Sequence, residues 1–314
     1  WWLVERVRDA LESEGLVELL CLPFVDARDL DRLGLAGDDP RREPIRVQNP
    51  IVENESHLRS SLLPSLLRVV RENLARQVER LAVFEVSRVF LRSKTDELPH
   101  EPSHLAVVLT GGEPRGPWES VGEAPLFFEL KGRLERLLAR LGRAATFEAD
   151  ASEPFLHPGS ACGIRAEGKR LGSLGGLHPA VAAAFGIEAP CVVAELDLEA
   201  IGSLPERPMR YREVSPYPSV RRDLAILVDR NQAAGELLEA IRRQGGGDLA
   251  TVEIFDRYEG KGVPEGQVSL AFRLTFQRMD RTLKDAEVGK HVDRVVRTLS
   301  QRFGGTLRRE GGEE

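Results

Sequence analysis

The sequence predicts an α+β protein in two parts: a larger module built on a mixed or antiparallel sheet, followed by a smaller unit with the order β-α-β-β-α-β. In residues 1–201, apolar runs typical of strands outnumber the helices that could join parallel strands one by one. From residue 214, the spacing of apolar residues switches between strand and helix periods in the order given. A length of 314 residues is sufficient for two domains of ordinary size.

The two parts meet at a break in the pattern. Residues 204–208 contain two prolines within five positions, which interrupts helix and strand alike. We therefore expect a linker at 202–213, between a module at 1–201 and a domain at 214–310. The chain begins with Trp1 rather than Met, so we expect a piece of a longer protein.

The composition is that of a globular protein in a reducing compartment. Hydrophobic residues make up 41% and charged residues 30%. No apolar run approaches the roughly 18 residues that a membrane helix needs. The three cysteines are far apart and odd in number, which indicates no disulfide framework and favours the cytoplasm. The net charge of -6 argues against bulk nucleic-acid binding by the whole chain.

In the first part, apolar spacing predicts strands and helices in mixed order. The longest helix is expected at 60–78, with Ser60 or Ser61 as its cap and Pro64 in its first turn. The other expected helices are at 4–11, 126–141 and 179–185. The expected strands are at 16–24, 82–90, 105–109, 161–164, 171–174 and 191–196.

The second part has the sharper pattern and predicts a ferredoxin-like fold. Strands are expected around 224–228, 252–254, 268–276 and 306–308, and helices around 237–241 and 288–303. Asp285 is the expected cap of the last helix, and Gly304 ends it. In this fold the strands lie in the order fourth, first, third, second, and both helices cover one sheet face. The other face stays open and carries Ser269, Arg273 and Thr275.

No residue pattern predicts a catalytic or metal site. His100 and His104 flank a proline and are interpreted as solvated loop residues rather than zinc ligands. Cys162 and Cys191 lie within apolar runs, where a buried and inert thiol is the usual state. The glycine-rich segments lack both the Lys-Ser/Thr of a P-loop and the spacing of a dinucleotide-binding turn.

The open face of the second part is the better candidate site. Residues 255–260 place Tyr258 at a strand end, beside acidic and basic residues, where it could stack on an unpaired base. The alternative is a tyrosine that covers the core. Arginine pairs at 221–222 and 308–309 flank the first and last strands and suit phosphate contacts, with ordinary solvated pairs as the alternative.

Ordered sequence blocks resemble the β subunit of bacterial phenylalanyl-tRNA synthetase, and they run in the family's order over nearly the whole chain. In the first part the blocks are NPIVENES at 49–56, LRSSLLPSLL at 58–67, FEVSRVF at 84–90, LKG at 130–132, HPGSA at 157–161 and LGSLGGLHP at 171–179. In the second part they are YPSVRRDLA at 217–225, FDRYEG at 255–260, SLAF at 269–272 and DRTL at 280–283.

The resemblance implies a class II synthetase-like module that has lost its chemistry at 1–201, followed by a ferredoxin-fold anticodon-binding domain. It implies an (αβ)2 heterotetramer that acts on tRNA-Phe, in which the α subunit holds ATP, Mg2+ and phenylalanine. No cofactor or metal is then expected in this chain. The family's OB-fold, editing and metal-site domains are not found in this sequence, so editing is not attributed to it.

The resemblance also implies an anticodon-contacting surface formed by Ala225, Asp256, Tyr258, Ser269 and Arg308. Tyr258 is expected to stack on a splayed base, and Asp256 and Ser269 to hydrogen-bond base edges. Ala225 would let a base approach closely, and Arg308 would stack or pair with phosphate. From the arginine pair at the first strand, Arg222 is expected to join them at a phosphate.

The helix at 60–78 and the strand at 82–90 have the layout of the class II interface motif. We therefore expect the helix stripe to be partly core and partly contact with the α subunit. Its members are Leu63, Leu66, Leu67, Val70 and Leu74.

Two other functions stay open. The chain could be a class II-like enzyme fragment that binds a nucleotide by itself, which ATP binding by the isolated chain would reveal. It could also be a generic ferredoxin-like regulatory module for small ligands, which would show no salt-sensitive affinity for tRNA.

Overall fold

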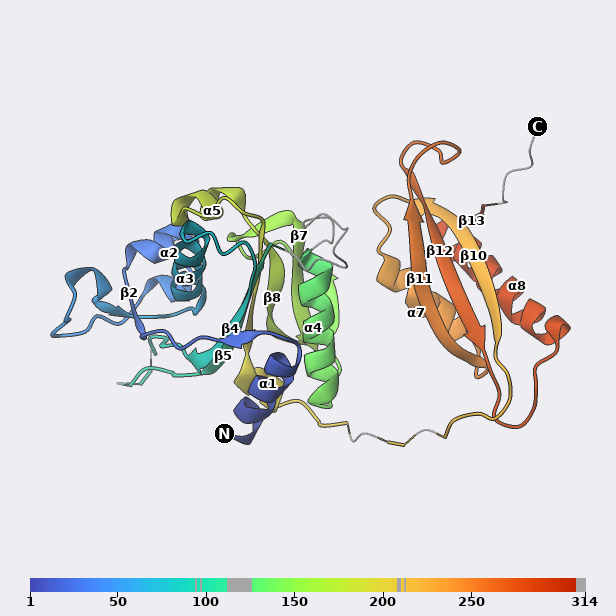
Figure 1. Ribbon diagram of the computed structural model, residues 1–314, viewed down its shortest axis with the longest axis horizontal. Helices are drawn as coiled ribbons and strands as arrows, with labels where there is room; N and C mark the ends of the chain where they lie inside the picture. The colour runs from blue at the N-terminus through green and yellow to red at the C-terminus, as the bar shows by residue number, and fades with distance from the viewer. Residues whose placement is uncertain (94, 97, 112–125, 208–209, 212, 309–314) are drawn as a thin grey trace. The chain divides into compact units, whose positions relative to one another are not determined.

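The computed structural model describes residues 1–93, 95–96, 98–111, 126–207, 210–211 and 213–308. The chain divides into two compact units, residues 1–209 and 210–314, and each is described by itself (Figure 1). Among the helices of the described ranges, none combines the length and apolar character that a bilayer crossing requires.

In its described residues, the first unit is built on a seven-stranded sheet in the order β1-β4-β5-β9-β8-β7-β6. β1 pairs with β4 in parallel and every other neighbouring pair is antiparallel, which confirms the mixed sheet. The strands are β1 (Val17–Glu18), β4 (Leu81–Arg88), β5 (Ser103–Thr110), β6 (Thr146–Ala149), β7 (Leu156–Ala166), β8 (Lys169–Leu177) and β9 (Cys191–Asp197). A small second sheet pairs β2 (Phe24–Val25) with β3 (His57–Leu58).

Helices cover both faces of the larger sheet, because consecutive residues of its central strands are apolar and point alternately to the two faces. Leu105 and Val107 of β5 belong to one buried cluster, and Ala106 and Val108 belong to another. The first cluster includes α1 (Trp2–Ser13), α4 (Leu126–Arg140) and α6 (Leu198–Gly202). The second includes α2 (Arg28–Arg32), α3 (Leu63–Ala75) and α5 (Pro179–Phe185). Figure 1 shows α3 and α4 on opposite sides of the sheet.

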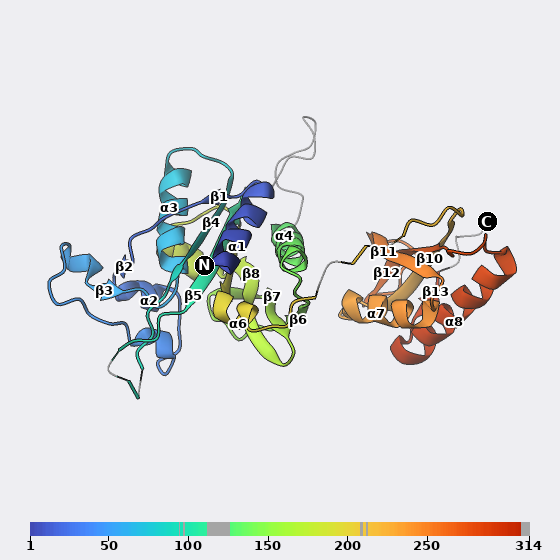
Figure 2. The ribbon, with the colours of Figure 1, turned by 90° about the horizontal axis from the view of Figure 1, so that it is seen from below.

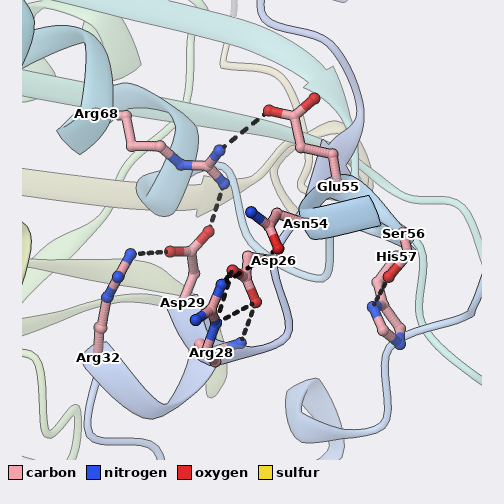
Figure 3. A network of polar contacts seen from close by, with 9 residues as sticks. All are labelled: Asp26, Arg28, Asp29, Arg32, Asn54, Glu55, Ser56, His57 and Arg68. Carbon is pink, nitrogen blue, oxygen red and sulfur yellow. Dashed lines mark hydrogen bonds and ion pairs between the residues drawn. The ribbon is translucent and has the colours of Figure 1, made fainter. Parts of the chain in front are cut away.

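A buried carboxylate ties three segments of the second cluster together (Figure 3). Asp29 of α2 is fully buried and forms ion pairs with Arg32, at 2.8 Å, and with Arg68 of α3. Arg68 also reaches Glu55 in the short 3-10 helix η2 (Glu53–Glu55), at 3.4 Å. These contacts fix the segment that contains the NPIVENES block against the helices. A second 3-10 helix, η1, spans Pro40–Arg42.

Three expectations for the first unit are wrong. The strand expected at 16–24 is reduced to β1 and the start of β2, because Leu20 and Leu22 between them are exposed. α3 is shorter than the helix predicted at 60–78, and its N-cap is Leu62 rather than Ser60 or Ser61. The Ser61 hydroxyl oxygen still accepts a hydrogen bond from the backbone N–H of Leu63, at 3.2 Å, and the hydroxyl donates its hydrogen to the carboxylate of Glu195, at 2.6 Å.

His104 is also not the solvated loop residue that the sequence suggested. It lies in β5, and its Nδ1 is 2.9 Å from the carboxylate of Glu195 on the neighbouring strand β9. The side chain of Glu195 is only 10% exposed. Burial alone would raise the pKa of Glu195, but bonds from His104, Ser61 and the Leu62 backbone outweigh it and lower that pKa.

The second unit has the predicted ferredoxin-like order. Its described strands lie in the sheet order β11-β12-β10-β13, all antiparallel, which is the expected order fourth, first, third, second read from the other edge. They are β10 (Val220–Asp229), β11 (Leu249–Tyr258), β12 (Gln267–Phe276) and β13 (Thr306–Leu307). The helices α7 (Ala234–Gly245) and α8 (Asp285–Phe303) lie on the same side of this sheet (Figure 2).

Strand alternation creates the core of the second unit. Leu224, Ile226 and Val228 of β10 point to the helices, together with every second residue of β12 from Val268 to Phe276. Gly304, with φ 64°, ends α8 as predicted. The predicted cap of α8 is wrong, because the N-cap is Lys284, whose backbone N–H donates to Glu287 at 3.0 Å.

Candidate nucleic-acid interface

In the second unit, the outer face of the four-stranded sheet, opposite the helices, has a hollow at its centre. Ala225 of β10 and Ala271 of β12 are register partners, and both are out of phase with the core residues. Two methyl side chains leave space where larger residues would fill it. The resulting hollow has a volume of about 740 Å³ and is lined by Asp223, Leu224, Ala225, Phe255, Ala271, Leu307 and Arg308.

A β-bulge in β11 turns the side chains of Phe255, Asp256 and Tyr258 toward this face. Ile254 pairs with Phe272, but Asp256 pairs with Ala271, so Phe255 is an extra residue. After the bulge Tyr258 is opposite Ser269 of β12. Simple alternation from Ile254 would have put Asp256 and Tyr258 on the helix side. The extra residue places them on the outer face instead.

Arg308 reaches across the sheet from its opposite edge. Its backbone N–H donates to the carbonyl of Ala225 at 2.8 Å, directly after β13. Its guanidinium carbon is 4.8 Å from the ring centre of Tyr258, on β11. A guanidinium over an aromatic ring is a cation–π contact. Tyr258 is 36% exposed, and its hydroxyl donates to the Lys261 carbonyl at 3.3 Å, so its ring lies on the outer face and not over the core.

The structure brings Ala225, Asp256, Tyr258 and Arg308 together on the outer face, and places the other two predicted residues differently. Ser269 has the same phase but is only 3% exposed, so the expectation of an open face is wrong at this point. Arg222 is in phase with the core residue Leu224, on the helix side. There it pairs with Asp285 at 2.7 Å, because strand alternation turns it away from the outer face. Arg309 lies outside the described residues.

Further residues of this face were not among the predicted site residues. The guanidinium carbon of Arg273 is 4.5 Å from the ring centre of Phe255. Arg273 also binds the carboxylate of Asp223 through two hydrogen bonds, at 3.0 and 2.7 Å. These bonds hold the pKa of Asp223 below its ordinary value. The sequence segment around Phe255 pointed to this strand end, but the alternation rule gives no signal of a bulge.

The expected subunit contact on α3 is wrong for four of its five residues. Leu63, Leu66, Leu67 and Val70 are completely buried in the cluster formed with α2, α5 and the sheet. A side chain with no exposed surface cannot contact another subunit. Leu74 is partly buried at the edge of the same cluster.

The described residues contain no group of three or more His, Cys, Asp or Glu that could hold a metal ion. Burial raises the pKa of the Cys162 thiol to about 11 and that of Cys191 to about 12. Both thiols are therefore protonated at neutral pH and are poor nucleophiles.

Comparison with known proteins gives both units a family. Residues 2–198 match the model described as phenylalanyl tRNA synthetase beta chain CLM domain, and residues 215–308 match the ferredoxin-fold anticodon binding domain. The phenylalanine–tRNA ligase β subunits of Syntrophotalea carbinolica and Moorella thermoacetica are 39% identical over 306 residues and 42% identical over 305. Each match covers 97% of this chain and 38% of the relative, so the chain spans less than half of their length.

A solved structure, that of pyrrolysyl-tRNA synthetase from Desulfitobacterium hafniense, is 17% identical with a TM-score of 0.49. The match covers 63% of this chain and 66% of that chain. The family match extends over most of the first unit, and the second match begins just after the break at the prolines. The chain belongs to the phenylalanyl-tRNA synthetase β-chain family.

Proposed function

We propose that this chain is the non-catalytic part of a phenylalanine–tRNA ligase β subunit that binds the anticodon region of tRNA-Phe. The observation that carries the proposal is the outer face of the second unit. It combines exposed aromatic rings, two arginines and a hollow. All of them lie within residues 215–308, which match the ferredoxin-fold anticodon binding domain. Stacking platforms beside positive charge are the means by which proteins bind single-stranded RNA.

Binding of an anticodon stem-loop by the chain tests this function. The stem-loop of tRNA-Phe should bind with an affinity that falls as salt is raised, because phosphate contacts release counterions. A stem-loop with a scrambled loop is the control. Equal affinity for both RNAs at every salt concentration would refute recognition of the anticodon.

The first unit is proposed to hold an α subunit in an (αβ)2 assembly, in the cytoplasm. The α subunit would supply the ATP, Mg2+ and phenylalanine sites, so this chain alone should leave ATP–pyrophosphate exchange at background. We propose functional boundaries at 1–201 and 214–310, joined by a linker at 202–213.

The contact with the α subunit is proposed at the segment between β1 and β2. Leu20 is 89% exposed and Leu22 is 68% exposed, and both line a surface hollow of about 570 Å³. Large apolar side chains exposed together mark an interaction surface. This segment provides the exposed leucines that the stripe on α3 lacks.

A further inference from the structure

We infer that Phe255 is a further stacking residue for an unpaired base in the hollow over Ala225 and Ala271, where the base faces the guanidinium of Arg308. This inference rests on the proposed function that the outer face binds RNA, and it adds new residues to the anticodon surface that the resemblance implies. Phe255 is the stacking residue, and Arg273 and Asp223 are its positioning residues.

The bulge in β11 places Phe255 where such a base could reach it. Phe255 and Asp256 both oppose Ala271, so two consecutive side chains project near the same point of the outer face. The ring of Phe255 is 47% exposed and lines the hollow. An exposed phenylalanine on a sheet is costly in water, and its partial exposure beside a hollow leaves an apolar surface for a ligand to cover.

Arg273 and Asp223 hold the ring in place. The Arg273 guanidinium lies over Phe255, and its two hydrogen bonds to Asp223 of β10 fix its orientation. Because Arg273 already contacts the ring, the part of Phe255 that lines the hollow is the part available to a base. A ring held before binding loses less conformational entropy when a base stacks on it.

The opposite wall is Arg308, whose guanidinium already contacts Tyr258. Among the described residues the lining includes Phe255 and Arg308 but not Tyr258. A base between Phe255 and Arg308 would therefore continue a row of stacked groups from Arg273 to Tyr258. Both walls present flat groups, and the floor is two methyl groups. Stacking of this kind tolerates any base, so the position should supply affinity with little base selectivity.

The test replaces Phe255 by leucine, which keeps an apolar side chain and removes the π face. The full chain is titrated with tRNA-Phe anticodon stem-loops that carry 2-aminopurine at one loop position at a time. F255L should weaken binding about 5- to 150-fold. It should also remove the fluorescence quenching at one loop position, while circular dichroism is unchanged. The matched control is F128L, at an exposed phenylalanine on α4.

R273K tests the positioning role. Lysine keeps the positive charge but cannot lie flat on the ring. The quenching at that loop position should decrease, whereas the salt dependence of binding should be unchanged. A variant that altered the salt dependence and left the quenching intact would show a phosphate contact instead and would overturn the positioning role.

The outcomes separate this inference from the proposed function. If the wild-type chain binds neither the stem-loop nor the scrambled control, both fail. If it binds the two RNAs equally, only recognition of the anticodon fails. If the wild type binds selectively and F255L binds and quenches like the wild type, only the inference fails. Selective wild-type binding with the loss of one quenched position in F255L supports both.

Discussion

The guanidinium of Arg308 lies 4.8 Å from the ring centre of Tyr258, although the two residues come from opposite edges of a four-stranded sheet. The contact is possible because the strands between these edges present Ala225 and Ala271 at this point. Larger side chains at either position would block the arginine's path. The pair therefore places a positive charge and an aromatic ring together above the middle of the outer face.

Replacement of Arg308 by alanine should weaken stem-loop binding and also flatten its salt dependence. If the guanidinium contacts one phosphate, the slope of log affinity against log salt should fall by about one. R308K should keep most of the slope while losing affinity, because an ammonium cannot stack on Tyr258 in the same way. Fluorescence titration at several salt concentrations measures both effects.

R222A is the matched control for R308A. Arg222 lies on the helix side of the same sheet and pairs with Asp285. Its loss changes the net charge by the same amount and should leave the affinity nearly unchanged. Equal effects of R222A and R308A would mean that binding depends on net charge and not on the outer face.

Replacement of Tyr258 by alanine should weaken binding by about 1–3 kcal/mol, since an aromatic stacking surface is lost. Y258F keeps the ring and loses only a long hydrogen bond to the Lys261 carbonyl. It should bind nearly as the wild type does. Stem-loop titrations of both variants measure these affinities, and circular dichroism checks that both are folded. A large loss in Y258F would show that the hydroxyl and not the ring carries the contact.

The sequence was sufficient to predict the strand order of the second unit because Leu224, Ile226 and Val228 alternate without interruption. It could not predict which way Asp256 and Tyr258 point. Alternation from the preceding strand residues places them toward the helices, and the reversal depends on a bulge set by pairing with β12. Nothing in the residue types marks that bulge.

The predicted contact between the α3 stripe and the α subunit was wrong for a different reason. An apolar stripe has the same appearance whether another helix of the chain or another subunit covers it. Leu66 is buried because α3 packs against β4 and also against β5 and α5, which are distant in the sequence. Conversely, the run at 16–24 is apolar like a strand, yet Leu20 is exposed. Only the tertiary structure distinguishes the two cases.

Substitution of Leu20 or Leu22 by aspartate should abolish co-purification with an α subunit without unfolding the chain. Both side chains are exposed, so a charge there costs little in the isolated chain. L66D should instead destabilise the first unit by more than about 4 kcal/mol, because it buries an unpaired carboxylate. Co-expression pull-downs and thermal unfolding measure the two effects.

L98D, at another exposed leucine of the first unit, is the control for the pull-down. It should leave co-purification intact. Should L20D and L22D both co-purify as the wild type does, the contact with the α subunit lies elsewhere.

The pair formed by His104 and Glu195 should make the stability of the first unit depend on pH. Burial alone would lower the pKa of His104, but the hydrogen bond and charge of Glu195 outweigh it and raise that pKa above its ordinary value of 6.5. A raised histidine pKa contributes stability that is complete below 6.5 and is lost as pH rises through the folded-state pKa. The lowered pKa of Glu195 acts oppositely, since its contribution is present above 4.5 and is lost as pH falls through its folded-state pKa.

The first unit should therefore be most stable in mildly acidic solution and should lose stability as pH rises from 6.5 through the raised pKa of His104. In H104N, an amide can occupy the position of Nδ1 as a donor to Glu195 but cannot become charged. Its thermal unfolding temperature should change less over this range than that of the wild type. H100N, at an exposed histidine, should keep the wild-type dependence, because His100 is solvated and 3.6 Å from its nearest carboxylate. Parallel pH profiles for the wild type and H104N would assign the pH dependence to other groups.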